Sequence, residues 1–168
     1  MSIWLPHTRR ILIPTLDHGP RAITRGVVIH STEGDSLPTS WFQRGSGGVG
    51  AHVAVGNREA VQYVSLDRKC WHAVEANGSW IGFEHVAHAS WSRDDWMHHH
   101  RMLELSANRV AWVLHDYELG RPKAGVNIRS HASGGAAWGG HHDPGGGFPW
   151  PHYLGLVHEA YMTHWGRR

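Results

Sequence analysis

Cysteine and lysine are scarce in this chain of 168 residues. Cys70 is the only cysteine, which excludes an internal disulfide and therefore a small secreted domain held together by disulfide bonds. No apolar run is long enough to cross a bilayer, so we expect neither a membrane span nor a membrane partner. The opening residues lack the basic region, apolar core and cleavage site of a secretory signal, which predicts that the chain is made in the cytoplasm.

Charge of one sign is not concentrated anywhere in the chain. The 16 basic and 14 acidic residues leave a net charge of +2, and the basic residues are scattered. This distribution gives no indication of a nucleic-acid partner. Because the length is that of one ordinary domain and no repeat or linker divides it, we expect residues 1–168 to form a single, monomeric domain.

Histidine, tryptophan and glycine are abundant instead, with 17, 10 and 21 residues. Imidazole is the commonest metal ligand among protein side chains, so the excess of histidine raises the expectation of metal chemistry. Most individual histidines give no such signal. His98, His99 and His100 follow one another in a predicted helix, where successive side chains point roughly 100° apart and cannot all face one ion.

Short apolar runs predict the strands of one sheet. The run GVVIHS over 26–31 is typical of a buried strand, and 50–55 with 60–64 predict a hairpin. A further strand is predicted over 80–87. Its period of two places Glu84 on one face and His85 on the other.

Helices are predicted beside these strands. A short helix follows Pro38, a long one covers 93–119 after a cap at Ser92, and a last one covers 152–165. Glycine fills seven of the 14 positions over 134–147, which is too flexible a composition for a helix or a central strand. The sequence therefore predicts an α/β fold, with a central mixed β-sheet flanked by helices.

Three side chains differ from the others in their setting. His30 ends a buried strand, where a polar ring is costly without a partner or a function. His131 opens the glycine-rich stretch, and Asp143 lies twelve residues later within it. Two imidazoles and one carboxylate are sufficient for a catalytic zinc site, which uses three protein ligands and leaves a position for water. A packing role for each stays the alternative, because ligands so far apart carry no short-range signature.

Five segments of the sequence together resemble the type 2 family of N-acetylmuramoyl-L-alanine amidases. These are zinc enzymes of phages and bacteria, related to the peptidoglycan-recognition proteins. The segments lie in family order between about residue 24 and residue 150: VVIHSTEG, VGAHVAVGNREAVQYV, CWHAVEANGSWIGFE, VNIRSH and HHDPGGGFPW. Each match is modest alone, and the five in order are specific.

The resemblance implies a cofactor, a substrate and a set of site residues. Zn²⁺ is the implied cofactor, with His30, His131 and Asp143 as its ligands, and peptidoglycan is the implied substrate. Glu84 matches the family's glutamate, which implies a general base acting on the attacking water. The implied reaction is hydrolysis of the amide between N-acetylmuramic acid and L-alanine. Positions that match the substrate groove are His52, Trp71, His72 and Asn77, and Trp138 is a candidate apolar wall of the same groove.

The chain departs from the family pattern at two positions. Many relatives carry a lysine two residues before the last ligand, where it stabilises the oxyanion. This chain has His141 there, which we expect to act as the hydrogen-bond donor. His142 beside it is an equal candidate for facing the metal or the oxyanion, and the choice stays open. Ala51 precedes His52 where some relatives have a tyrosine, so no phenol acts at that position.

The expected biological role is lysis of a bacterial host by a phage endolysin, made in the host cytoplasm and acting on the cell wall after release. Two alternatives stay open. One is a cytoplasmic amidase that recycles soluble anhydromuropeptides, and the other is a module that binds peptidoglycan without cutting it. The combination of Glu84 with three candidate ligands argues against the second, because binding alone needs no metal, water and base.

Overall fold

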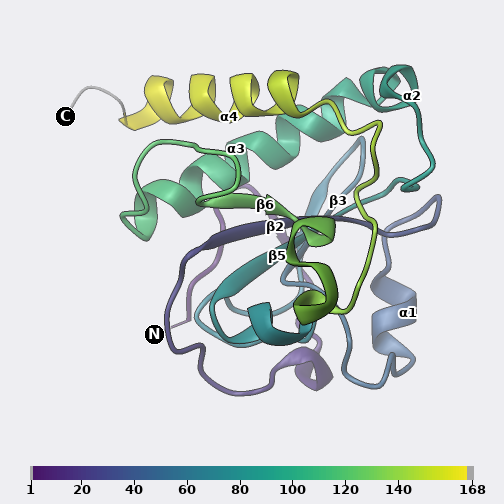
Figure 1. Cartoon of the computed structure of the whole chain (residues 1–168). Helices are drawn as coiled ribbons and strands as arrows, with labels where there is room; N and C mark the ends of the chain where they lie inside the picture. Colours follow the sequence, from purple (N-terminus) through teal and green to yellow (C-terminus); the bar gives the residue numbers. More distant parts are fainter. Residues whose placement is uncertain (1, 166–168) are drawn as a thin grey trace.

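The computed structural model describes residues 2–165, and a six-stranded mixed sheet forms its centre (Figure 1). The strands lie in the order β1, β4, β3, β5, β2, β6. Their bounds are β1 (Arg9–Arg10), β2 (Gly26–Ser31), β3 (Val53–Val55), β4 (Ala60–Gln62), β5 (Trp80–His85) and β6 (Ile128–Ser130). Among the described strands, β3 and β4 pair antiparallel, and the other neighbours pair parallel.

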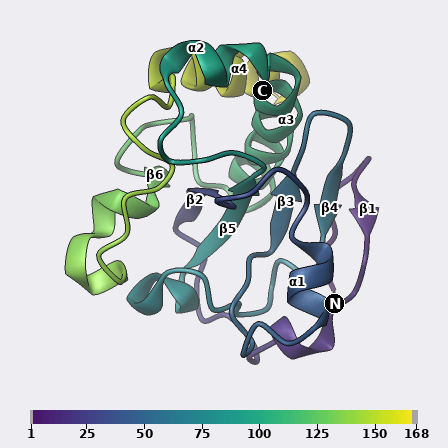
Figure 2. The ribbon, with the colours of Figure 1, turned by 90° about the vertical axis from the view of Figure 1, so that its right-hand side faces the viewer.

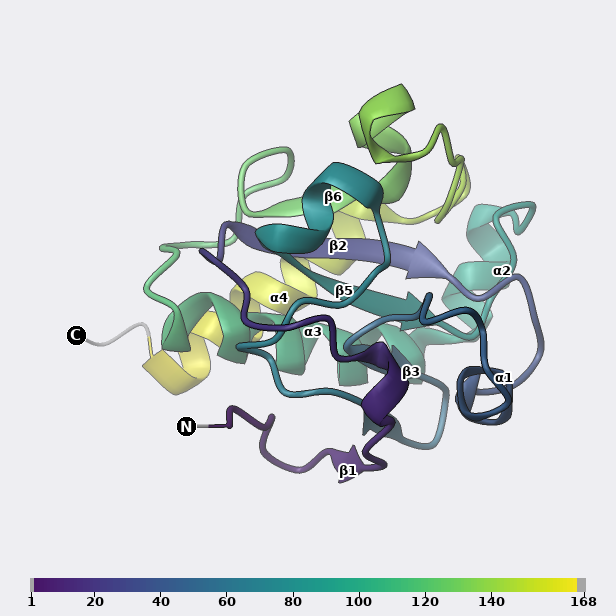
Figure 3. The same ribbon diagram turned by 90° about the horizontal axis from the view of Figure 1, so that it is seen from below.

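Two long helices cover one face of the sheet. They are α3 (His100–Asp116) and α4 (Trp150–Trp165), which pack against each other (Figures 1 and 2). The shorter helices are α1 (Thr39–Gln43), α2 (Arg93–His98) and the 3-10 turns η1 (Pro14–Leu16), η2 (Val74–Gly78) and η3 (His131–Trp138). Figure 3 shows η2 in front of the strands with α3 and α4 behind them. None of the described helices is both long and apolar enough to span a bilayer.

The two-residue period of the strands divides their side chains between these faces. Val27 and Ile29 of β2 belong to the core beneath α3 and α4, whereas Val28 packs with the tryptophans on the opposite face. In β5, Phe83 lies on the helix side and Glu84 lines a cavity on the other. The alternation predicted for this strand is confirmed: it points Glu84 away from the main core and His85 toward the helices.

A chain of buried hydrogen bonds ties the helices to the strand that carries His30. The ring of His85 lies 3.1 Å through Nδ1 from the carbonyl oxygen of His30 and 2.8 Å through Nε2 from Ser106 Oγ. Ser106 Oγ is 2.8 Å from the hydroxyl of Tyr153. Burial lowers the pKa of His85 to about 4, so the ring is neutral near pH 7. Because a carbonyl only accepts, His85 Nδ1 donates to His30, and Nε2 accepts from Ser106.

The predicted fold class is confirmed, and so are the strands of the hairpin, the strand over 26–31 and the last helix. Strands β1 and β6 are short and were not predicted.

Two predictions about helices were wrong. The helix predicted over 93–119 is broken at His99, between α2 and α3. There the ring of His99 stacks on Trp91 with centroids 4.5 Å apart, and the backbone leaves helical geometry. The predicted cap at Ser92 is present and forms a capping box with Asp95. The glycine-rich stretch was predicted to lack helix, yet η3 extends into it as far as Trp138, with a kink where Gly135 has a φ of 53°.

We predict that Ser106→Ala destabilises the protein by about 1–3 kcal/mol, because His85 and Tyr153 lose a shared buried partner. Urea unfolding followed by circular dichroism measures the loss. Ser90→Ala, at an exposed position, is the matched control and should shift the unfolding free energy by less than about 0.5 kcal/mol. Equal values for the two variants would mean that the hydrogen-bond chain contributes nothing.

Candidate active site

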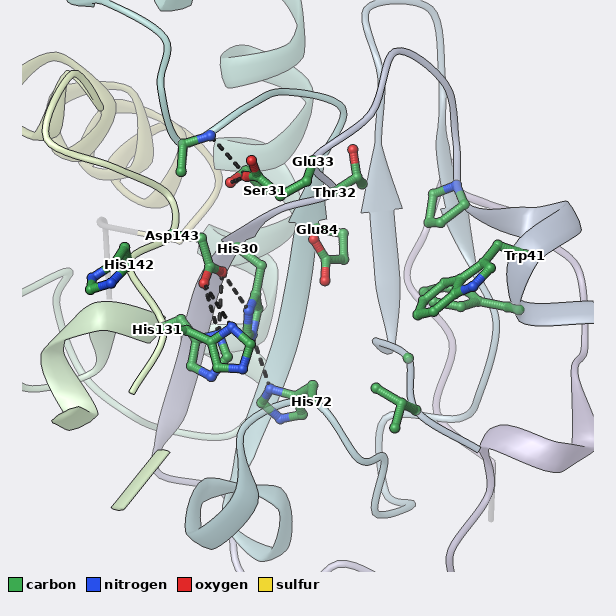
Figure 4. Close-up of a pocket in the computed structure, with 16 residues that line it drawn as sticks. His30, Ser31, Thr32, Glu33, Trp41, His72, Glu84, His131, His142 and Asp143 are labelled. Carbon is green, nitrogen blue, oxygen red and sulfur yellow. Dashed lines mark hydrogen bonds and ion pairs between the residues drawn. The ribbon is translucent and has the colours of Figure 1, made fainter. Parts of the chain in front are cut away.

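A cavity of about 420 Å³ opens on the face of the sheet away from α3 and α4 (Figure 4). His30 lies near the end of β2, Glu84 near the end of β5, and His131 directly follows β6. The register aligns His30 with Glu84, and Ile29 with Ser130. The carboxyl ends of parallel strands therefore bring these side chains to one edge of the sheet, where ligands bind in open α/β sheets.

His30, His131 and Asp143 converge on one point of this cavity. His30 Nδ1 is 3.0 Å from Asp143 Oδ2, and His131 Nδ1 is 3.0 Å from Asp143 Oδ1. The three side chains are buried, and one ligand atom from each lies within 4.8 Å of the others. Asp143 lies in the glycine-rich loop. Its backbone carbonyl accepts a hydrogen bond from the amide of Ala132, which holds the loop beside His131.

The electrostatics of this cluster favour an ionised Asp143 carboxylate beside a neutral His30 ring. Burial by itself would raise the pKa of Asp143, but its close contacts with the imidazole rings of His131 and His30 outweigh burial and hold that pKa below its ordinary value. Burial lowers the pKa of His30, although Asp143 opposes this. A carboxylate with two imidazoles that keep a lone pair is the donor set that a divalent transition metal requires.

The Nε2 atoms of His30 and His131 also have hydrogen-bond partners, as expected for histidines that bind a metal through the other ring nitrogen. His131 Nε2 is 2.7 Å from the carbonyl oxygen of Trp138. His30 Nε2 is 3.1 Å from Nδ1 of His72. These contacts leave the two Nδ1 atoms facing Asp143 (Figure 4), so the residues present fit a zinc ion held by two nitrogens and one oxygen.

Glu84 faces the same cavity from the neighbouring strand (Figure 4). Its buried Oε2 has no hydrogen-bond partner among the described residues. Burial raises the pKa of Glu84 to about 8, with smaller contributions from the charges of Asp143 and Glu33. A carboxyl group with a pKa near neutrality and an unpaired oxygen aimed into a cavity is suited to proton transfer.

The loop after η3 places His141 against the cluster. Its ring stacks on His131 with centroids 4.3 Å apart and an interplanar angle of 15°, and its Nδ1 is 3.9 Å from Asp143 Oδ1. The side chain is 60% exposed, so it is accessible from the open side of the cavity. His142 lines the same cavity (Figure 4).

The structure brings only part of the expected groove together. His72 lines the cavity, and Trp71 lies exposed outside its lining, stacked on His18 at 3.7 Å. Asn77 has a local role, since its Oδ1 accepts from the backbone amides of His72 and Ala73.

Two groove predictions conflict with the geometry of the described residues. His52 is fully buried, and its ring nitrogens contact the carbonyl oxygen of Arg68 and the amide of Gly82, so it is a packing residue beneath the cavity. Trp138 is also buried, in contact with Trp80 rather than in the wall of the cavity.

Sequence reasoning did not single out Trp41 and Glu33, which are among the residues that line the cavity. Trp41 lines it from α1 and is 52% exposed, although no periodicity singled it out. Glu33 lines it from the loop after β2, where its Oε1 accepts from Ser31 Oγ and the amide of Ala89. A large apolar side chain in so short a helix was the available signal for Trp41.

The fold and the site define a class of protein. Two imidazole nitrogens and a carboxylate that could hold a metal ion, with a second carboxylate beside them, are a combination typical of metal-dependent hydrolases. A sequence profile of N-acetylmuramoyl-L-alanine amidases matches residues 20–146, and the chain belongs to this family. No curated protein matches the chain.

Several solved structures share the fold. The Staphylococcus aureus hydrolase AmiA gives a TM-score of 0.77 at 18% identity, over 98% of this chain and 88% of that one. The N-acetylmuramoyl-L-alanine amidase LysC of Clostridium intestinale gives 0.66 at 12% identity, over 90% and 97%. A mutant endolysin from Bacillus subtilis gives 0.65 at 14% identity, over 89% and 97%. At these identities the similarity establishes the architecture.

We predict that Glu84→Gln stabilises the metal-free protein at alkaline pH. The pKa of Glu84 is raised from 4.5 to about 8 on folding, so between these values the folded state holds a proton that the unfolded state has lost. The unfolding free energy of the parent therefore falls as pH rises across this window, by at most about 1.4 kcal/mol per pH unit. Urea unfolding at several pH values should show a smaller fall in the variant. Glu75→Gln, on an exposed turn, should behave as the parent does. Parallel pH profiles for all three proteins would contradict the raised pKa.

Proposed function

We propose that this chain is a zinc-dependent N-acetylmuramoyl-L-alanine amidase that hydrolyses the amide between the lactyl group of N-acetylmuramic acid and L-alanine in peptidoglycan. The observation that carries the proposal is the convergence of His30, His131 and Asp143 on one side of a cavity that Glu84 faces from the neighbouring strand. Family membership supplies the bond and the substrate.

The metal would be held by Nδ1 of His30, Nδ1 of His131 and the carboxylate of Asp143. When bound, zinc supplies Lewis acidity toward the scissile carbonyl and the attacking water. Burial of the three ligands excludes competing solvent from their inner side. The open side of the cavity leaves room for the amide to approach.

Glu84 acts as the general base and then as the general acid. Its carboxylate takes a proton from water as the oxygen attacks the carbonyl carbon, and it returns a proton to the leaving nitrogen as the carbon–nitrogen bond breaks. The products are the lactyl carboxylate and the free amine of L-alanine. The unpaired Oε2 suits this role, since no other described side chain competes for its proton.

His141 donates a hydrogen bond to the oxyanion that develops on the carbonyl oxygen. Its stacking on His131 fixes the ring beside the ligand cluster, and its exposure leaves a nitrogen free toward the substrate. This assigns His141 the role that a lysine has in many relatives. His142 is the competing candidate, and the prediction below distinguishes them.

The walls of the cavity fit a substrate with both sugar and peptide parts. Trp41 and Val49 present exposed apolar surface in the cavity lining, where Trp41 lies across from Asp143 (Figure 4), and Trp71, paired with Val49, extends that surface beyond the cavity. We expect these side chains and His72 to contact the muropeptide. We also expect a monomer that needs no nucleic acid or membrane to act.

The biological role that we infer is that of a phage endolysin, made in the host cytoplasm and acting on the cell wall after release. The fold shared with an endolysin supports this role. Intact sacculi and soluble anhydromuropeptides should be compared as substrates. Release of stem peptides from sacculi is the expected result, whereas turnover of the soluble fragments alone would assign the chain to recycling.

We predict that Glu84→Gln lowers the turnover number by about 10²- to 10⁴-fold, because general acid–base catalysis contributes that much. Zinc content should stay that of the parent, since Glu84 is not in the ligand cluster. Release of stem peptides, followed by mass spectrometry, measures the rate. Turnover at the parental rate in a zinc-loaded variant would remove Glu84 from the mechanism.

For His141→Ala we expect a loss of turnover of up to about 10²-fold with zinc retained, because one oxyanion donor is lost and the three ligands are untouched. His141→Lys should keep most of the turnover, since an ammonium group can donate in the same place. His142→Ala is the matched control and should keep its activity. A large loss of zinc in His141→Ala would make His141 a ligand, and a loss of turnover confined to His142→Ala would transfer the role to that residue.

A further inference from the structure

The Nε2 atoms of His30 and His131 contact a small group of hydrogen-bond acceptors, made of the His72 ring and two backbone carbonyls. His131 Nε2 contacts the carbonyl oxygen of Trp138 at 2.7 Å. His30 Nε2 contacts His72 Nδ1 at 3.1 Å, and His72 Nε2 in turn contacts the carbonyl oxygen of Trp80 at 3.1 Å. Both paths therefore end on the backbone carbonyl of a tryptophan.

A carbonyl oxygen can only accept a hydrogen bond, which fixes the proton positions along each path. His131 Nε2 must carry hydrogen to donate to Trp138, so a neutral His131 keeps its lone pair on Nδ1. His72 Nε2 must likewise carry hydrogen to donate to Trp80. The Nδ1 atom of a neutral His72 is then an acceptor, and His30 Nε2 is the donor that faces it.

His72 is held neutral by its surroundings. Its ring is buried, its nitrogens contact only His30 and the carbonyl oxygen of Trp80, and no carboxylate of the described residues pairs with it, so a charged ring there would be costly. The ring of His72 also packs closely against the backbone of Gly82. A Cβ atom on residue 82 would lie 2.8 Å from the ring carbon Cγ of His72. Gly82 therefore leaves the space that the ring occupies.

If His30 and His131 carried hydrogen on Nδ1 instead of Nε2, that hydrogen would compete with metal binding. Asp143 lies 3.0 Å from the Nδ1 atoms of both His30 and His131, and its carboxylate attracts a proton to each of these nitrogens. A ring protonated on Nδ1 cannot bind a metal through that atom. The acceptors on the inner side favour the other tautomer, which leaves each Nδ1 lone pair free.

The two tryptophans that supply the carbonyls are themselves joined. Their rings meet edge to face with centroids 5.6 Å apart, and the guanidinium of Arg129 lies 4.5 Å from the ring of Trp138 and 5.7 Å from that of Trp80. Arg129 also donates to the carbonyl and the hydroxyl of Ser133, within η3. One cation–π cluster thus holds both acceptor carbonyls in place.

We propose that His72 is a positioning residue which, with the carbonyls of Trp80 and Trp138, holds both ligand histidines in the tautomer that carries hydrogen on Nε2 and so prepares the metal site. This proposal rests on the proposed function, because it assigns the site its metal. Partners in this outer layer typically change metal affinity by about 10- to 100-fold when they are removed.

The test uses His72→Phe, which keeps a ring of similar size and removes both hydrogen bonds, and His72→Gln, whose amide offers an acceptor and a donor at a similar spacing. We expect zinc affinity to fall about 10- to 100-fold in His72→Phe and to stay near the parental value in His72→Gln. His52→Phe is the buried control and should keep the parental affinity, since neither nitrogen of His52 contacts a ligand residue. Competition with a chromogenic chelator measures the dissociation constants.

The second readout is independent of zinc and of activity. Two-bond ¹H–¹⁵N correlation spectra of the metal-free protein should show His30 protonated on Nε2 in the parent and shifted toward the Nδ1-protonated form in His72→Phe. Unchanged zinc affinity in a folded His72→Phe variant, an equal loss in His72→Gln, or a parental His30 protonated on Nδ1 would each overturn the proposal. A parent that binds no zinc would instead overturn the proposed function, and the two failures are therefore distinguishable.

Discussion

The carboxylate of Asp143 between the rings of His30 and His131 is the contact on which the site depends. It joins the end of β2, the turn after β6 and the glycine-rich loop. His30 and Asp143, the first and last of the three residues, are more than a hundred positions apart in the sequence. Parallel pairing of β2 with β5 and β6 places two of the three groups at one edge of the sheet. The loop needs its glycines to bring the third group there, since Gly139, Gly140 and Gly145 all have positive φ angles.

The same edge also holds an ionisable carboxyl group whose charged form the fold does not stabilise. Glu84 is half-buried on the strand next to His30, and its buried Oε2 is unpaired, so ionising it costs free energy. Protein cores rarely contain an unpaired carboxyl group. Such a group in a cavity, with a raised pKa, is characteristic of sites that catalyse proton transfer. Stability comes from elsewhere, through the apolar contacts of α3 and α4 with the opposite face and through the hydrogen-bond chain from Tyr153 to His30.

Much of this arrangement was predictable from the sequence. The β-branched run before His30 and the two-residue period around Glu84 are local signals, and the structure follows both. The candidate metal-binding group of His30, His131 and Asp143 could be predicted from the family resemblance, because five separated segments occur in family order. Spacing alone could not have found it, since contacts between distant residues leave no local pattern.

The wrong or missing predictions concern features that depend on tertiary contacts or on very short segments. The break at His99 depends on a ring stacked on Trp91, which apolar periodicity does not register. The burial of His52 and Trp138 depends on what packs above them, and a motif match does not specify exposure. The two-residue strand β1 and the three-residue strand β6 are too short to show a period, although β6 positions His131.

Metal content and bond specificity are best measured together on one preparation of the purified protein. Elemental analysis gives the zinc content, and mass spectrometry of digested peptidoglycan gives the bond that is cut. The account predicts one zinc per chain and stem peptides that begin with a free L-alanine amine, released only by the zinc-loaded protein. Equal release by the metal-free protein, or cleavage at any other bond, would contradict it.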